Sequence, residues 1–577
     1  MDNLAIARIL AEIGDLLEIR GDNPFKIRAY RNGAETLVDA AAPAAGMTEA
    51  QLQALPGIGR DLAKKIREIV ETGDAAFHRE LLEEFPPTIL DLLRLPGLGP
   101  RTVRQLYTEL GVRTLADLEA AARDGRLEGL RGMGPKKRDL ILRAVETRQK
   151  YQGRHLLPDM HDVAAALVAA LRQDVPAADI LPVGSARRGC ETCGDLDILV
   201  SGADRAAIDR FLGYRLVEEV LARGETKASA RLWGGIQADL RLVPAESRGA
   251  AMQYFTGSKA HNIALRDRAL QRGFKLNEYG LFRLDTGDRV AGETEDGIYE
   301  ALGLAWIPPE LREHRGELEA AEARQLPRLI ELADLQGDLH AHTTATDGRD
   351  GIDAMARAAK ALGLGYLAIT DHSQALTMSN GLDERRALEH ARRIREANTR
   401  IEGLRLLAGI ECDIRADGTL DLADDCLAEL DYVVASVHSG FSQEAAQMTD
   451  RLLRAIENPW VDTIGHPSGR KLLKREPHRG DMSAVADAAA RHGVALEINC
   501  QVDRLDLSDV NARMARERGV KLIIASDAHS QAGFGVLRWG VQVARRAWVG
   551  PDDVLNTRSA DEFVAGLRRR RARRAAS

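Results

Sequence analysis

The sequence is poor in cysteine and in aromatic side chains, and it has no long apolar run. Five cysteines in 577 residues exclude a disulfide framework. The one CxxC pair, Cys190 and Cys193, lacks the second pair that a structural zinc site needs. Aromatic residues make up 4% of the chain, so we expect a core of Leu, Val, Ile and Ala. There is no apolar run of about 18 residues and no signal-peptide pattern at the N-terminus, so we expect a cytoplasmic protein without a membrane partner.

Length and charge indicate a multidomain protein. At roughly 100–200 residues per domain, the length predicts about three to five domains. The net charge of −7, from 80 basic and 87 acidic residues, is unusual for a nucleic-acid binder, but net charge does not report local distribution. Six arginines lie in the last ten residues, at 568–571, 573 and 574. We expect this tail to be disordered and to add nonspecific phosphate contacts.

One short pattern occurs three times in the first 150 residues. It is LPGIGRDLAKKI at 55–66, LPGLGPRTVRQL at 95–106 and LRGMGPKKRDLI at 130–141. Paired glycines permit a tight turn, and the following helix N-terminus offers free N–H groups, which together bind a phosphate without reading a base. The segments resemble helix-hairpin-helix motifs. This resemblance implies that the DNA backbone is bound at Gly57, Gly59, Gly97, Gly99, Gly132 and Gly134.

Two strand-like segments carry acidic residues that can converge. Asp195 and Asp197 share one face of a strand because side chains alternate, and Asp239 lies in a second strand that can pair beside it. Three convergent carboxylates suit two Mg²⁺ ions, or Mn²⁺, and such a pair supports transfer of a phosphoryl group. The upstream residues that fit a triphosphate are Gly184, Ser185, Arg187 and Arg188.

Four longer strings are more specific than the acidic pair alone. They are GSARRGCETCGDLDILV (184–200), YFTGSKAHNIALRDRA (254–269), GFKLNEYGLF (273–282) and NPFKIRAYRNGAETL (23–37). They resemble parts of the family X DNA polymerases. Residues 184–200 resemble the palm, 254–269 the nucleotide-facing helix, 273–282 the thumb and 23–37 the small lyase domain. The resemblance implies that Asp195, Asp197 and Asp239 are catalytic metal ligands. It also implies that Lys65 forms the Schiff base of a deoxyribose-phosphate lyase. The implied nucleotide contacts are Gly184, Ser185, Arg188, Gly194, Tyr254, Phe255, Gly257, Asn262 and Arg266.

After residue 336 short apolar strands alternate regularly with helices. Nine of the 14 histidines lie in this region, and most strands end in His, Asp or Glu. Seven strand–helix units indicate a parallel barrel with its polar groups gathered at the C-terminal ends of the strands. His, Asp and Glu together suit Zn²⁺ or Mn²⁺.

This region resembles the polymerase and histidinol phosphatase (PHP) domain, which implies up to three bound ions. By resemblance the first ion is held by His340, His342, Glu411 and Asp527, the second by Glu411, His438 and His466, and the third by Asp347, His372 and His529. The histidines that match nothing, and that we expect at the surface, are His390, His478 and His492.

The combination resembles bacterial and archaeal family X DNA polymerases with a C-terminal PHP domain. It implies a polymerase that fills short gaps in base excision repair and a metal-dependent 3′-5′ exonuclease. We expect a monomer that binds gapped or primed DNA and deoxynucleoside triphosphates. The expected fold is multidomain, α and α/β: a helical lyase-like domain (1–85), helix-hairpin-helix fingers (86–155), a nucleotidyltransferase α+β palm (156–249), a thumb (250–310), a helical linker (311–335), a distorted (β/α)7 PHP barrel (336–567) and the arginine-rich tail (568–577).

Two other functions fit parts of the sequence. A PHP phosphoesterase acting on a small molecule would use the front half only to bind DNA, which leaves the three palm carboxylates unexplained. A non-catalytic module that binds DNA ends would explain the three repeated motifs, but not the intact sets of metal ligands.

Overall fold

The computed structural model describes residues 3–39, 44–86, 88–93, 95, 98–130, 132–150, 153–176 and 178–576. The chain forms two compact units, residues 1–152 with 473–475, and residues 153–472 with 476–577. Among the described residues, no helix is both long and apolar enough to cross a membrane.

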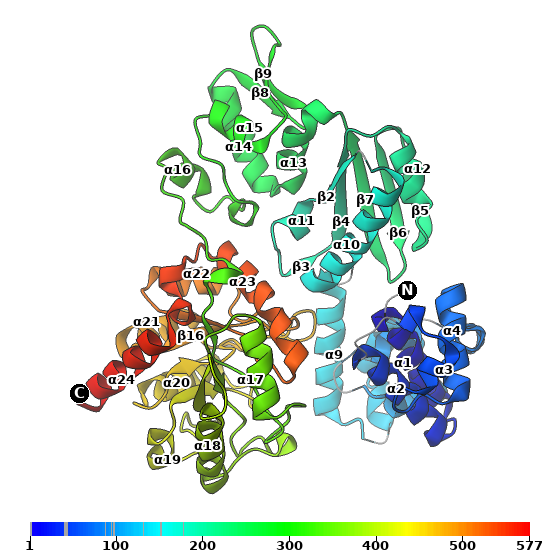
Figure 1. Cartoon of the computed structure of the whole chain (residues 1–577). Coiled ribbons are helices and arrows are strands. Elements are labelled where there is room, and N and C mark those ends of the chain that lie inside the picture. Colours follow the sequence, from blue (N-terminus) through cyan, green and yellow to red (C-terminus); the bar gives the residue numbers. More distant parts are fainter. Residues whose placement is uncertain are drawn as a thin grey trace. The chain divides into compact units, whose positions relative to one another are not determined.

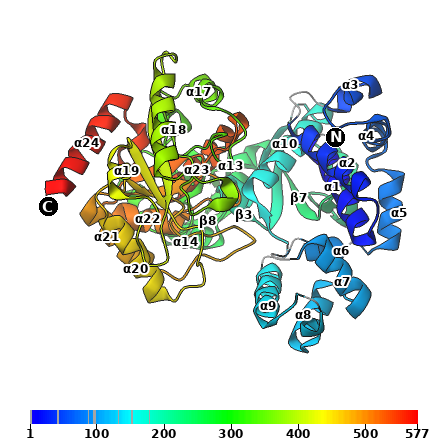
Figure 2. The same cartoon turned by 90° about the horizontal axis from the view of Figure 1, so that it is seen from below.

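The first unit is helical throughout its described residues (Figures 1 and 2). Apolar residues spaced three or four apart along the first helix, such as Ile6, Leu10 and Ile13, are fully buried, as expected for an amphipathic helix that packs through one face. The helices are α1 (Asn3–Arg20), α2 (Pro24–Asp39), α3 (Glu49–Gln53), α4 (Arg60–Thr72), α5 (Ala76–Glu84), α6 (Thr88–Leu93), α7 (Pro100–Leu110), α8 (Leu115–Arg123) and α9 (Pro135–Lys150).

The second unit begins with a five-stranded mixed sheet, in the order β2-β4-β7-β6-β5, within its described residues. Strands β4 and β7 are parallel neighbours at its centre. Leu196 and Ile198 of β4 pack in the core with Leu171 and Phe211. The helices that carry Leu171 and Phe211, α10 and α12, therefore cover the face of the sheet opposite Asp195 and Asp197. The elements are α10 (Leu157–Asp174), β2 (Asp179–Pro182), α11 (Gly184–Arg187), β4 (Asp195–Ser201), α12 (Ala206–Leu212), β5 (Val217–Arg223), β6 (Lys227–Leu232) and β7 (Ile236–Val243); a short β1 (His155–Leu156) pairs with β3 (Thr192–Cys193).

A smaller subdomain with a three-stranded sheet follows. Its elements are α13 (Arg248–Thr256), α14 (Lys259–Gln271), β8 (Phe274–Asn277), β9 (Gly280–Arg283), β10 (Arg289–Ala291) and α15 (Glu295–Ala301).

The predicted helical linker 311–335 is largely wrong, because only α16 (Glu317–Glu322) is α-helical there. Glu317 is fully buried. Its carboxylate lies 2.6 Å from His261 Nδ1 and accepts hydrogen bonds from the backbone N–H groups of His314 and Arg315. This segment is therefore tied to α14 rather than extended as a free helix.

The C-terminal region is a parallel sheet of seven strands, in chain order from β11 to β17, over its described residues. The predicted (β/α) barrel is confirmed, with helices outside the strands (Figures 1 and 2). The strands are β11 (Gly337–Asp338), β12 (Tyr366–Ile369), β13 (Arg405–Asp413), β14 (Tyr432–Ser436), β15 (Thr463–Ile464), β16 (Ala495–Asn499) and β17 (Leu522–Ala525). The α-helices are α17 (Ile352–Ala361), α18 (Glu384–Asn398), α19 (Asp424–Ala428), α20 (Ala445–Glu457), α21 (Met482–His492), α22 (Asp509–Glu517), α23 (Leu537–Arg546) and α24 (Ala560–Ala576).

A side chain helps to close the barrel between its first and last strands, β11 and β17. Ala341 and Ala528 form an isolated parallel bridge just beyond the first and last strands. The buried amide of Asn556 donates to the carbonyls of Gly337 and Ile524, both at 2.8 Å, and its oxygen accepts from the N–H of Ile524. This amide therefore joins the backbones of β11 and β17.

The predicted disordered tail is wrong, because α24 runs to Ala576. Phe563 stacks on Tyr366, which begins β12, and lies in one buried cluster with inward-facing strand residues. Arg570 and Arg571 both bind the buried carboxylate of Asp462, next to the start of β15. Helix α24 therefore covers the N-terminal end of the barrel, and these two arginines have a structural role.

Candidate active sites and metal centre

The palm carboxylates come together because of strand register. Asp197 on β4 lies directly opposite Asp239 on β7, and Asp195 precedes Asp197 on the same face. Ligand oxygens of all three lie within 4.8 Å of one another. Burial, with the neighbouring charges of Asp195 and Asp239, raises the pKa of Asp197 to about 7. Such mutual repulsion is relieved by a divalent cation, so this donor set fits Mg²⁺ or Mn²⁺.

A short helix places the predicted triphosphate residues beside these carboxylates. Gly184, which begins α11, has φ +65°, and a Cβ there would lie 2.2 Å from Asp197 Oδ2. Only glycine therefore allows the helix to approach the acids so closely. At the exposed Gly194 a Cβ would meet no atom of the described residues within 4 Å. Contacts within the described chain therefore do not require glycine at position 194. Ser185 is half-buried in α11.

The two neighbouring arginines have different partners. Arg187 forms a two-pronged ion pair with Glu295, at 2.8 and 2.7 Å, so the sequence-based expectation that it contacts a triphosphate is wrong. Arg188 donates to the carbonyl of Thr256 and, through Nε, to Glu313 Oε1 at 3.0 Å. Among the described residues, the hydrogen-bond partner of its Nη2 is the sulfur of Cys190, at 3.8 Å, a weak acceptor that leaves this edge of the guanidinium for a phosphate.

The predicted sugar-facing segment is the end of α13 and the turn into α14. Gly257 has φ +70° in this turn. Asn262 donates to the carbonyl of Tyr254 at 2.7 Å. The Phe255 ring lies 5.2 Å from the guanidinium of Arg241, a residue of β7. Phe255 therefore contacts the strand that carries Asp239. Arg266 is exposed and lies further along α14.

The repeated motifs share one turn in the first unit. Ile58, Leu98 and Met133, the residues between the glycines, are buried, and each N–H donates to the carbonyl three residues earlier. Gly57 and Gly132 have φ of +75° and +81°. Gly97 lies outside the described residues.

The second glycine of each pair is not required by the turn. Gly59 and Gly99 have φ of −80° and −84° at the starts of α4 and α7. A Cβ on Gly59, Gly99 or Gly134 would meet no atom of the described residues within 4 Å. The surface there is open to a close-approaching ligand.

Lys65, the lysine predicted for a lyase reaction, lies beside a residue that the sequence analysis did not assign. Lys65 Nζ is 5.0 Å from the centre of the Phe77 ring, and Lys26 Nζ is 4.3 Å from it. Tyr30 stacks on the same ring. Both amines therefore lie near the same aromatic ring, and no sequence spacing indicated this pairing.

The nine predicted PHP residues gather at the C-terminal ends of the barrel strands. His340 and His342 follow β11, His372 follows β12, and the others occupy corresponding ends or the loop after His342. Three groups of ligand atoms lie within 4.8 Å: His342, Asp347, His372 and His529; His340, His342 and Asp527; and His372, Glu411 and His438. His372 therefore joins two groups, which differs from the sets expected by resemblance. His466 Nε2 lies 3.0 Å from Glu411 Oε1.

Glu411 is at the centre of this cluster. Its Oε2 lies 2.8 Å from His372 Nδ1 and 3.4 Å from His340 Nε2, while Oε1 lies 3.3 Å from His438 Nε2. Burial alone would raise the pKa of Glu411. The neighbouring histidines, of which His438 has the largest effect, hold this pKa well below its usual range. The carboxylate is therefore ionised and has neighbours on both oxygens.

The buried nitrogens fit metal ions better than they fit hydrogen bonds. His340 Nε2 and both ring nitrogens of His342 are buried and make no hydrogen bond, although His342 Nε2 lies 3.1 Å from Asp527 Oδ1. Buried polar atoms without partners are rare in proteins. Two of the expected ligands, His466 and Asp527, also have positive φ, of 28° and 53°, a strained conformation for residues other than glycine. Imidazole and carboxylate donors in this arrangement fit Zn²⁺ or Mn²⁺.

Supporting residues orient these donors, and the sequence analysis did not assign them. Glu497 of β16 lies 2.7 Å from His340 Nδ1, the geometry that fixes a ligating histidine. His390 Nε2 lies 2.8 Å from Asp371, which also accepts from Thr343.

The expectation that His390 and His478 lie at the surface is wrong, since both are buried. His492 is half-buried at the end of α21.

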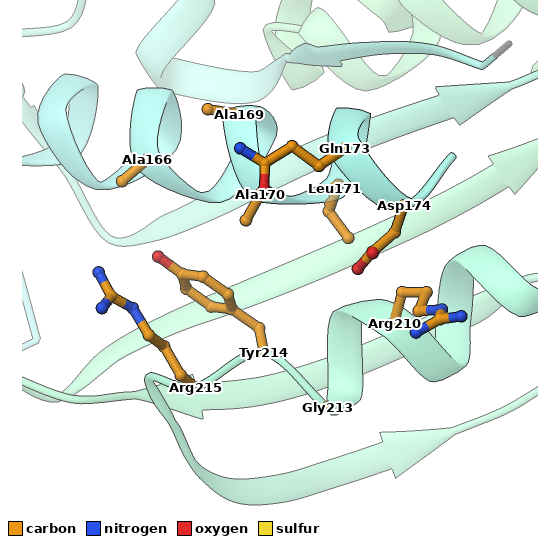
Figure 3. A pocket seen from close by; sticks show the side chains of 10 residues that line it. All are labelled: Ala166, Ala169, Ala170, Leu171, Gln173, Asp174, Arg210, Gly213, Tyr214 and Arg215. Carbon is orange, nitrogen blue, oxygen red and sulfur yellow. The ribbon is translucent and has the colours of Figure 1, made fainter. Parts of the chain in front are cut away.

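A separate cavity of about 540 Å³ lies on the palm, between α10 and the loop from α12 to β5 (Figure 3). Helix α10 forms one wall with small side chains and, at its end, Asp174, while Arg210 and Tyr214 line the other side. Helix α10 packs on the sheet face opposite the carboxylates, so this cavity is not part of the palm site.

A palm carboxylate site and a PHP-type metal centre in one chain define a nucleotidyltransferase joined to a phosphoesterase. Family models match a helix-hairpin-helix domain at residues 1–75 and a SAM-like helix-hairpin-helix tandem at 89–147. They also match a DNA polymerase beta thumb at 251–313 and a PHP domain at 338–501.

The chain is 37% identical over 567 residues to the DNA polymerase/3′-5′ exonuclease PolX of Bacillus subtilis. The matched region covers 98% of this chain and 99% of that protein. It is 32% identical over 231 residues to a probable phosphatase of Thermoanaerobacter sp., covering 38% of this chain and 89% of the phosphatase. A probable phosphatase of Shewanella sp. is 31% identical over 230 residues, covering 38% of this chain and 86% of the phosphatase. The chain belongs to the family X DNA polymerases with a C-terminal PHP domain.

Proposed function

We propose that this protein is a DNA-directed DNA polymerase that fills short gaps during base excision repair, and that its PHP domain is a 3′-5′ exonuclease. The observation that carries the proposal is the presence of two separate sets of metal donors in one chain. One is the carboxylate triad of the palm, and the other is the barrel cluster of nine residues, in which His466 contacts Glu411. The similarity to probable phosphatases covers only 38% of the chain, so a small-molecule phosphatase would leave the palm unexplained.

In the palm, Asp195, Asp197 and Asp239 hold Mg²⁺ or Mn²⁺. These ions, when bound, would favour attack by the primer 3′-hydroxyl on the α-phosphate and stabilise the pyrophosphate that leaves. Arg188 and Ser185 bind the triphosphate. The exposed surface at Gly194 lets the triphosphate approach the backbone closely. Tyr254, Phe255 and Gly257 lie against the incoming sugar, while Asn262 and Arg266 contact the nucleotide and the template side.

In the PHP domain, the nine donors hold up to three Zn²⁺ or Mn²⁺ ions. The ions, when bound, polarise a phosphodiester and lower the pKa of a water molecule. Glu411 places one carboxylate oxygen toward His372 and the other toward His438. Glu497 orients His340.

DNA reaches these sites through contacts to its backbone. The helix N-termini at Gly59, Gly99 and Gly134 bind phosphates without reading bases, and Gly57 and Gly132 form the turns before two of them. By the repeated sequence pattern, Gly97 belongs to the same set of DNA-binding residues. Lys65, with Lys26 beside it, is the candidate amine for a lyase reaction on a 5′-deoxyribose phosphate. We expect a monomeric, cytoplasmic enzyme that uses deoxynucleoside triphosphates.

One assay tests both activities. Labelled gapped DNA is incubated with Mg²⁺ or Mn²⁺, with and without nucleotides. We expect extension when nucleotides are present and 3′ shortening when they are absent. A chain that does neither on DNA, yet hydrolyses a small phosphate ester, would contradict the proposal. Borohydride trapping of Lys65→Ala against the unchanged chain tests the lyase.

A further inference from the structure

Helix α23 of the PHP domain contacts the proposed triphosphate loop of the palm, residues 184–194. Arg546, at the end of α23, is 8% exposed. Its Nη1 donates to the carbonyl of Arg188 and to Glu313 Oε1, both at 2.9 Å, and its Nη2 donates to Asp509 at 2.9 Å. Gln542, one turn earlier, occupies the space where a Cβ of Gly189 would lie. The loop is thus held in part by residues about 350 positions later in the chain (Figure 1).

Glu313 is shared between two arginines. The same oxygen, Oε1, accepts from Arg546 Nη1 at 2.9 Å and from Arg188 Nε at 3.0 Å. Cys190 Sγ lies 3.7 Å from this oxygen, and Arg546 also pairs with Asp509, which binds Arg315 at 3.0 Å. The network therefore combines three guanidinium groups with two carboxylates.

This charge balance determines what Arg188 can offer to a triphosphate. With Arg546 present, the network has one surplus positive charge. Without Arg546, Glu313 would be balanced by Arg188 alone and would compete with an anionic ligand for that guanidinium. The carbonyl of Arg188 would also lose the N–H donor that Arg546 supplies.

We propose that Arg546 is a positioning residue of the polymerase site: it neutralises Glu313, and so keeps Arg188 available to the triphosphate of the incoming nucleotide. The inference rests on the proposed role of Arg188. It makes nucleotide binding in the palm depend on the PHP domain, independently of the metals of that domain. A second contact, the two-pronged pair of Arg470 with Glu191 at 2.9 and 2.7 Å, holds the other end of the same loop.

The experiment measures KM and kcat for nucleotide incorporation on gapped DNA by the full chain, with 3′-5′ nuclease activity as the test of intact folding. For Arg546→Met we expect KM to rise about tenfold, with kcat changed less than about twofold, because a charged hydrogen bond is lost. The matched control is Arg545→Met. Arg545 lies on the same helix and pairs with Glu310 at 2.7 Å, without touching Arg188, so its KM should not change.

A double variant separates charge from mere structural support. Glu313→Gln keeps an acceptor oxygen but removes the charge, so Arg546→Met combined with Glu313→Gln should recover most of the lost affinity. Failure of this recovery, or an equal fall of kcat and nuclease activity in Arg546→Met, would overturn the inference. If Arg188→Ala raises KM and Arg546→Met does not, this inference alone is wrong. If Arg188→Ala itself leaves KM unchanged, the assignment of the triphosphate site is wrong.

Discussion

Asp197 lies between two other carboxylates, and its pKa is raised to about 7 by burial and then by Asp195 and Asp239. The folded chain therefore favours the protonated form more than the unfolded chain does. Its contribution to stability is present below about pH 4 and is lost as the pH rises through about 7. A divalent cation reverses this cost by binding the ionised form.

This predicts a stabilising substitution at a catalytic position. In chelator at about pH 8, Asp197→Asn should raise the free energy of unfolding by about 4 kcal/mol, the linkage value of a pKa raised from 3.8 to about 7, and the difference should largely vanish near pH 4. Thermal unfolding at both pH values measures it. If the substitution destabilises the metal-free chain at pH 8, repulsion among the carboxylates is not the dominant effect.

Glu411 has histidine neighbours on both oxygens. We therefore expect Glu411→Ala to lose more metal per chain than any other single substitution in the cluster, together with all 3′-5′ nuclease activity. His529→Ala should lose less, because His529 is close to Asp347 and not to Glu411. Elemental analysis and a digestion assay check this, with His492→Ala as the control outside the cluster. An active Glu411→Ala would refute the assigned centre.

At the scale of elements, the two glycines of the repeated motif look alike in the sequence but have different backbone conformations. Gly57 needs a positive φ, and Gly59 does not. A substitution at Gly57 must strain the turn, whereas one at Gly59 fills only the space above a helix N-terminus.

Gly59→Val should therefore leave the thermal stability of the chain nearly unchanged and weaken DNA binding about tenfold, equally for all sequences, because phosphates carry no base information. Gly57→Val should lower stability as well. Gly46→Val, at an exposed glycine with empty space around it, is the control. Fluorescence anisotropy with several duplexes measures the affinity, and a loss confined to some sequences would argue against backbone binding.

At the scale of the whole molecule, the two sets of donors belong to different sheets. The triad lies on β4 and β7 of the palm, and the nine-residue cluster lies on the barrel. Chemistry at one site does not use a donor of the other.

Asp195→Ala combined with Asp197→Ala should accordingly abolish nucleotide addition and leave 3′-5′ digestion at the wild-type rate. Neither carboxylate has a neighbour able to replace it. The two activities are measured on the same labelled DNA, with and without nucleotides. Loss of digestion in a variant that still unfolds cooperatively would show that the sites are not independent.

The sequence by itself determined the order of the elements and the identity of the donors. Strand alternation placed Asp195 with Asp197, and the regular strand–helix units placed polar residues at the ends of barrel strands, because both patterns are local and periodic. The glycine pairs were visible for the same reason.

Only the tertiary structure decided which residues share a site across long separations in the chain. Arg187 and Arg188 are adjacent and chemically alike, yet Arg187 is bound to Glu295 and Arg188 to Glu313. The arginine-rich tail became a helix because Phe563 and Leu567 fill the end of the barrel and Asp462 binds Arg570 and Arg571. Glu497, Asn556 and Arg546 act on partners more than 150 positions away, and no local pattern can predict contacts that exist only after the sheets have formed.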